Sequence, residues 1–136
     1  KKKLEKISRE ERVHYDYFEG ELLKKRIRPT IMSPAWKLAS FFIGALTTRL
    51  GSNYVHACTE AVEEVIVKHY QQQIKYLEKS KADNSLKKKI KEFCKEENDH
   101  RANAYESIEG EDLSLKVFKN LTKRFTRLAI KVSKKV

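Results

Sequence analysis

The sequence carries one short motif twice, and its side chains are suited to binding metal. The motif is Glu-x-x-His, found at Glu11 and His14 and again at Glu97 and His100. On an α-helix, residues three apart project from the same face. A carboxylate offers two oxygens and a neutral imidazole offers one nitrogen, so two such pairs facing each other could hold two metal ions.

A helical wheel places both motifs on the apolar face of their helices. The acids next to them are expected to point away from that face: Glu10, Glu92, Glu96 and Asp99. A third segment contributes Glu63, which falls among apolar residues, whereas Glu60 and Glu64 are expected to face solvent. A buried carboxylate is costly unless it is neutral, paired or bound to a cation. A bound cation would explain all three inward glutamates together.

His69 and Tyr70 lie on the same side of their helix as Glu63 and are predicted to support the ligands without binding the metal. His69 would hold a ligating carboxylate in place, and Tyr70 would donate its hydroxyl nearby. Two plainer interpretations stay open. A core histidine often serves only in packing, and the inward acids could be helix-boundary positions neutralised by some of the 30 Lys and Arg residues.

Long helices are needed to bring these residues together, and the apolar periodicity predicts five of them. They are expected at about residues 2–25, 33–50, 53–79, 85–109 and 113–135. Pro29, Gly51 and Gly110 mark the ends of the first, second and fourth helices, and Ser33 is the expected N-cap of the second. Short connections between long helices predict an all-α fold. We expect a single antiparallel bundle over residues 1–136, of the ferritin-like kind.

The charge composition indicates that a binding partner is anionic. The formal net charge is +11, from 30 Lys and Arg against 19 Asp and Glu, which suits nucleic acid or a lipid surface. No nucleic-acid partner is expected, because the sequence has no zinc knuckle, RNP motif or recognition helix. Such a partner would also leave the inward glutamates unexplained. Cys58 and Cys94 form no metal-binding pair, which favours a reducing compartment.

The second helix is the most apolar, and it is predicted to lie buried in the bundle or on a membrane surface. Between Ile31 and Leu50 only Lys37 and Arg49 are charged, and that length is near the lower limit for crossing a bilayer. The polar Ser40, Thr47 and Thr48 and the early Pro34 argue against a span.

The fifth helix is basic and amphipathic. Residues 113–135 contain no Asp or Glu. The basic residues of this segment are Lys116, Lys119, Lys123, Arg124, Arg127, Lys131, Lys134 and Lys135. A helix of this kind can lie on anionic lipid, so peripheral binding to an anionic membrane surface is predicted. A solvated lysine-rich face is the alternative.

Several segments resemble the demethoxyubiquinone hydroxylase family of ubiquinone biosynthesis. They are "RIRPT", "PAWKLASFFIGALTTRLG", "ACTEAVEEVIVKHYQQQI", "FCKEENDH" and "RLAIKVSKKV", in that family's order and spacing. The resemblance runs from about Ser8 to Val136. It implies a ferritin-like bundle with a di-iron centre that inserts one oxygen atom of O2 into the demethoxyquinone ring.

The resemblance also implies a role for each inward residue. Glu11 and Glu97 would bridge two iron ions, Glu63 would be a terminal ligand, and His14 and His100 would complete the set. The family has one further ligand glutamate on a preceding helix that this chain lacks. The chain is therefore expected to be truncated at its N-terminus. The alternative is a ferritin-like metal- or quinone-binding bundle without hydroxylase activity.

The implied substrate is a lipid quinone, which must come from a membrane. Trp36, Phe41 and Phe42 of the apolar second helix are the predicted quinone or membrane contacts, with bundle core as the alternative. The expected location is peripheral on an inner membrane, on the cytoplasmic side in a bacterium or the matrix side in a mitochondrion. Other proteins of quinone biosynthesis are possible partners.

Overall fold

Five α-helices make up almost all of the described chain. In the computed structural model, which describes residues 2–80 and 83–135, they are α1 (Lys2–Lys24), α2 (Ser33–Leu50), α3 (Ser52–Ser80), α4 (Asn84–Glu106) and α5 (Leu113–Ser133). These residues contain no β-strand. The predicted all-α fold with about five helices is therefore confirmed.

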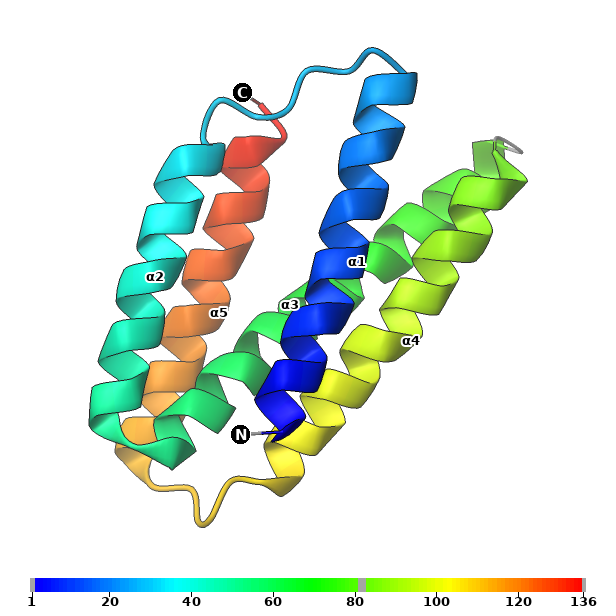
Figure 1. Cartoon of the computed structure of the whole chain (residues 1–136). Helices are drawn as coiled ribbons and strands as arrows, with labels where there is room; N and C mark the ends of the chain where they lie inside the picture. The colour runs from blue at the N-terminus through cyan, green and yellow to red at the C-terminus, as the bar shows by residue number, and fades with distance from the viewer. Residues whose placement is uncertain (1, 81–82, 136) are drawn as a thin grey trace.

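The helices form an up-and-down bundle in which consecutive helices run in opposite directions (Figure 1). The central helix is α3, which packs against α4, α5 and α2. Helix α1 lies between α4 and the pair formed by α2 and α5 (Figure 1). It is held to α4 mainly by side chains, including His14 and Phe18. This arrangement brings the inward residues of α1, α3 and α4 into one region.

The sequence signals at the helix ends are only partly those expected. Gly51 ends α2 with a φ of 111°, a conformation that glycine adopts without strain. The predicted N-cap at Ser33 is wrong, because Ser33 is the first helical residue and Met32 occupies the cap position without a side-chain hydrogen bond. Helix α4 ends at Glu106, before the predicted stop at Gly110, and its C-cap residue is Ser107.

Two aspartates start helices after short connections. The Asp83 carboxylate accepts a hydrogen bond from the Leu86 backbone N–H at 3.0 Å, and the Asp112 carboxylate accepts one from Leu115 at 2.8 Å. Each bond satisfies a backbone donor that has no partner within the first helical turn. Asp83 and Asp112 therefore fix where α4 and α5 begin.

The core lies along α3 and α4. Ala57 and Ala61 of α3 are completely buried, and such small side chains allow close approach of the neighbouring helices. Phe93 of α4 is almost completely buried, and its ring packs edge-on against Phe18 and Tyr17 of α1. The aromatic contacts hold α1 against α4 beside the inward glutamates.

A buried ion cluster joins α3 to α5, and it corrects the expectation that Glu60 faces solvent. Glu60 is 4 % exposed, and its carboxylate lies 2.8 Å from the ammonium of Lys119. Lys119 also pairs with Glu111 at 2.8 Å, and Lys123 pairs with Glu64. The basic face of α5 is therefore partly neutralised by acids of α3 and of the connection before α5.

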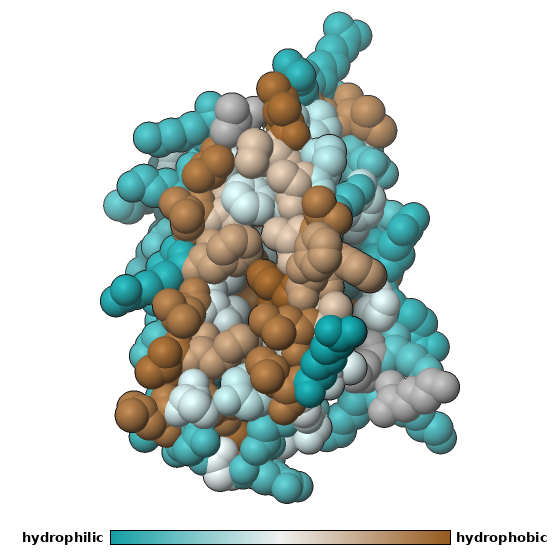
Figure 2. Space-filling model, turned by 90° about the vertical axis from the view of Figure 1, so that its left-hand side faces the viewer, coloured by the Kyte–Doolittle hydropathy of each residue, from teal (hydrophilic) through white to brown (hydrophobic). Residues whose placement is uncertain are grey.

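The outer side of α2 and α5 is apolar and exposed. Figure 2 shows apolar residues gathered along this side. We call it the α2–α5 face; its large exposed side chains are Leu38, Phe41, Phe42, Leu46, Val117, Leu121, Phe125 and Leu128. None of the described helices is both long enough and apolar enough to span a bilayer.

Candidate metal centre

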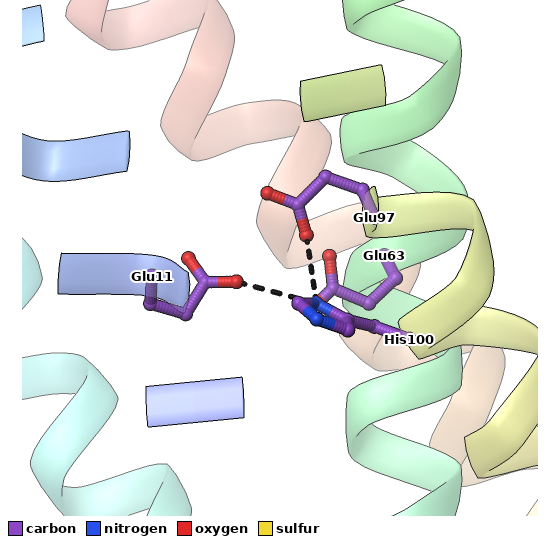
Figure 3. A group of neighbouring side chains, drawn as sticks. All are labelled: Glu11, Glu63, Glu97 and His100. Atoms are coloured by element: carbon purple, nitrogen blue, oxygen red, sulfur yellow. Dashed lines mark hydrogen bonds and ion pairs between the residues drawn. The ribbon is translucent and has the colours of Figure 1, made fainter. Parts of the chain in front are cut away.

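Four inward side chains from three helices converge on one point (Figure 3). Glu11 of α1, Glu63 of α3 and Glu97 and His100 of α4 each offer a ligand atom, and these four atoms lie within 4.8 Å of one another. His14 of α1 joins the group through Glu97, since its Nδ1 lies 2.9 Å from Glu97 Oε1. The five residues singled out by the sequence are thus brought together.

The local geometry follows from the motif spacing. Glu97 and His100 are one helical turn apart on α4, and Glu97 Oε2 lies 3.3 Å from His100 Nδ1. Glu97 therefore contacts both histidines, one through each oxygen. Its side chain is 3 % exposed, whereas that of Glu11 is 46 % exposed and lies 3.5 Å from His100 Nδ1. Glu11 marks the more open side of the group.

Glu10 and Glu96 also reach the site, which corrects the expectation that they point away. Glu10 Oε2 lies 2.8 Å from His100 Nε2, and Glu96 Oε2 lies 2.6 Å from His14 Nε2. A helical wheel gives the direction of the Cβ atom only, and the flexible Glu side chain can fold back from the edge of a face. The signal available in the sequence was the acid directly before each motif, giving Glu-Glu-x-x-His twice.

The surroundings of the cluster shift the pKa values of its two buried carboxyl groups in opposite directions. Burial, followed by the charges of Glu97 and Glu11, raises the pKa of Glu63 to about 9. Burial also disfavours charge on Glu97, but hydrogen bonds from His100 and His14 outweigh it and lower the pKa of Glu97 to about 2. One buried carboxyl therefore stays protonated while its neighbour is charged.

The neighbouring carboxylates raise the pKa values of both histidines of the cluster. Hydrogen bonds to Glu11 and Glu97 raise the pKa of His100 to about 11. For His14, burial disfavours the charged ring, but Glu97 and Glu96 overcome it and raise the pKa. Protons on buried acids and imidazoles occupy the positions where a cation would neutralise the same negative charge.

The two residues predicted to support the ligands have different surroundings. Burial and then the charges of Glu97 and Glu11 raise the pKa of Tyr70, so its hydroxyl stays protonated close to the cluster. His69 lines a groove of about 280 Å³ between α3 and α5, together with Arg127 and Lys134. Among the described residues its ring has no hydrogen bond to a cluster carboxylate, so its supporting role stays a prediction.

An apolar cavity of about 450 Å³ lies beside the cluster, between α2, α3 and α5. Glu63 forms part of its wall, and Trp36 and Phe125 line it toward the α2–α5 face. Trp36 is half-buried, and its Nε1–H donates to Ser133 Oγ at 2.8 Å. Phe41 and Phe42 do not line this cavity; they are 69 % and 62 % exposed on the outer surface.

These features define a class: an all-helical bundle with an internal group of carboxylates and histidines that could hold a metal ion, next to an apolar cavity. Comparison with known protein families then identifies the family within this class. The chain belongs to the family described as ubiquinone biosynthesis protein COQ7, whose model matches residues 1–133.

Named relatives support this membership. The chain is 35 % identical over 127 residues to the 3-demethoxyubiquinol 3-hydroxylase of Rhodospirillum rubrum, covering 93 % of this chain and 59 % of that protein. It is 34 % identical over 134 residues to the mitochondrial NADPH-dependent 3-demethoxyubiquinone 3-hydroxylase of Dictyostelium discoideum, covering 98 % of this chain and 62 % of that protein. The chain thus spans about three-fifths of the length of these relatives.

Proposed function

We propose that the protein is an iron-dependent oxygenase that hydroxylates demethoxyubiquinone, or its quinol, in ubiquinone biosynthesis. The observation that carries this proposal is the position of Glu63, which belongs to the candidate metal centre and also forms part of the wall of the apolar cavity. The names of the relatives supply the substrate class.

The residues of the centre fit iron by their chemistry. Carboxylate oxygens and imidazole nitrogens are the donors that non-haem iron uses, and they tolerate both its Fe(II) and Fe(III) states. The cluster brings three carboxylates and one histidine together, with His14 beside them. Negative charge held together in a largely buried site is stabilised by cations. We assign two iron ions to the centre.

Each ligand has a position that suits a distinct role. We assign Glu97 as a bridge between two ions, and its contacts support this: one carboxylate oxygen contacts His14 and the other contacts His100. We assign Glu11 as the second bridge and Glu63 as a terminal ligand. The iron would supply the O2 chemistry that side chains cannot perform. The protein residues hold the ligand geometry, and the apolar walls limit access of water.

The cavity suits an apolar ring and not a charged substrate. Trp36, Ile43, Val62 and Phe125 are among its lining residues, and Glu63 is the only acid among them. A quinone ring seated there would lie next to the side of the centre formed by Glu63. We therefore assign Trp36 to the quinone site and Phe41 and Phe42 to contact with the membrane.

The α2–α5 face is the proposed membrane contact. It carries large exposed apolar side chains, and exposed basic residues of α5 adjoin it, including Arg124, Arg127 and Lys131. Apolar side chains in the acyl region and basic residues at the headgroups together favour an anionic surface. We propose peripheral binding to an inner membrane, on the matrix side in a mitochondrion or the cytoplasmic side in a bacterium.

A turnover experiment tests this function. The chain would be loaded with Fe(II) without oxygen, given demethoxyubiquinol in lipid nanodiscs with a chemical reductant, and then exposed to ¹⁸O2. The expected result is a hydroxylated quinone that carries one ¹⁸O atom, in wild type and not in Glu97→Ala. Iron and quinone binding without product would contradict hydroxylation and favour a metal- or quinone-binding bundle instead.

A further inference from the structure

Glu10 and Glu96 form a crossed pair around the candidate metal centre. Glu10 on α1 contacts Nε2 of His100 on α4, at 2.8 Å. Glu96 on α4 contacts Nε2 of His14 on α1, at 2.6 Å. The acid directly before each motif thus contacts the histidine of the other motif, not the histidine of its own.

The two rings present the same nitrogen to the centre. Nδ1 of His14 faces Glu97 Oε1 at 2.9 Å, and Nδ1 of His100 faces Glu97 Oε2 at 3.3 Å. A neutral imidazole has one N–H donor and one lone pair, and an ionised carboxylate can only accept. If Nε2–H donates to the outer glutamate, the lone pair of Nδ1 is left facing the centre.

We propose that Glu10 and Glu96 are positioning residues that fix the tautomer and orientation of the histidine on the opposite helix. Each holds its ring with Nε2 protonated and Nδ1 free for a metal ion, and each ties α1 to α4 across the site. A histidine ligand held by a carboxylate in this way has a fixed orientation and greater basicity. This inference rests on the proposed metal centre.

The contacts are unlike ordinary surface ion pairs. Both imidazole side chains are only 5 % exposed, although the glutamates that hold them are 28 % and 36 % exposed. Glu10 also lies 3.5 Å from Lys6, which is 70 % exposed. The Lys6 contact is expected to contribute little, because exposed ion pairs are weak. The effect of replacing Glu10 should therefore come mainly from its contact with the buried His100 and not from its contact with the exposed Lys6.

Nuclear magnetic resonance of ¹⁵N-histidine in the Zn²⁺-loaded chain tests the crossed pattern directly. The chain has four histidines, so His56 and His69 serve as internal references. In wild type we expect a slowly exchanging Nε2–H and a metal-shifted Nδ1 for both His14 and His100. Glu96→Ala should abolish the protected Nε2–H of His14 alone, and Glu10→Ala that of His100 alone.

Metal affinity gives the second readout. Titration with Co²⁺, followed by its visible absorption, should show a 10- to 100-fold loss of affinity in each alanine variant and a smaller loss in Glu10→Gln and Glu96→Gln, which keep an acceptor oxygen. Glu19→Gln on α1 and Glu92→Gln on α4 are matched controls, since both residues are exposed. Both controls should retain wild-type affinity. Circular dichroism verifies that each variant folds.

The possible failures can be told apart. A wild-type chain that binds neither Zn²⁺ nor Co²⁺ would overturn the metal centre and the positioning role with it. Normal metal affinity and intact ring signals in both alanine variants would overturn the positioning role alone. Loss of the ring signal on the variant's own helix, His14 in Glu10→Ala, would also overturn the crossed arrangement.

Discussion

Glu63 is costly to the metal-free fold and has a central place in the proposed function. Its carboxyl is buried beside Glu97 and Glu11, and burial is the main reason why its pKa rises to about 9. An acid with a raised pKa in the folded state stabilises the fold fully below its unfolded value of 4.5, and this contribution is lost as pH rises toward 9.

Glu63→Gln is therefore expected to stabilise the metal-free chain and to weaken metal binding. The gain in the free energy of unfolding should be near zero at pH 4 and should increase with pH to at most about 3 kcal/mol at pH 7. Urea denaturation of both chains across this pH range measures the difference. Glu64→Gln, on the adjacent residue, should weaken the fold slightly and leave metal affinity unchanged. A gain independent of pH would contradict the account.

The sequence predicts the residues of the centre better than it predicts their surroundings. Glu11, Glu63 and Glu97 are recognisable because a carboxylate on an apolar face is exceptional. Helix periodicity does not predict the inward contacts of Glu10 and Glu60, because it locates a Cβ atom and not the end of a long side chain. Whether such a side chain turns inward depends on its partner on another helix, here His100 or Lys119.

At the scale of the helix, the end of α2 and the starts of α4 and α5 follow from local chemistry. Gly51 and the two capping aspartates act within one turn, so the ends that they define can be read from the sequence. The early end of α4 at Glu106 could not be read in this way, because nothing in the residues up to Gly110 forbids a helix. The packing of α1 also depends on distant contacts, such as that of Phe18 with Phe93.

The ion cluster between α3 and α5 gives a prediction about how these helices stay together. Lys119→Met should destabilise the fold by about 3–5 kcal/mol, because it leaves the carboxylate of Glu60 buried without its cation. The double variant with Glu60→Met should recover most of that loss. Lys116→Met, an exposed change on the same helix, should alter the free energy of unfolding by less than about 0.5 kcal/mol. Equal effects of the two single changes in urea denaturation would contradict a buried pair.

Helix α2 gives a prediction about membrane contact. Replacing Phe41 and Phe42 by serine should weaken partition onto anionic vesicles roughly tenfold or more, since two large apolar side chains no longer leave water. Vesicle co-sedimentation measures this. Tyr76 and Tyr105 are exposed on α3 and α4, and their replacement by serine is the matched control, with no expected change. Equal losses in both double variants would argue against α2 as the contact.

For the whole molecule, the net charge of +11 and the α2–α5 face act together. Binding to anionic vesicles should fall steeply as salt rises from 0.15 to 1 M, because the screening length shortens from about 8 to about 3 Å. A residual, salt-resistant part should remain from apolar contact, and it should be lost in the variant with serine at positions 41 and 42. Binding that is independent of salt would exclude the electrostatic contribution.

The central claim is that three helices of this bundle together hold two metal ions. Crystals of the chain grown with Fe(II) without oxygen, measured at the iron absorption edge, test it most directly. The account predicts two anomalous peaks roughly 3.5–4 Å apart, as in other two-metal sites. Glu11, Glu63, Glu97, His14 and His100 should surround them. A well-folded chain with iron bound elsewhere, or with no peak among these five side chains, would contradict it.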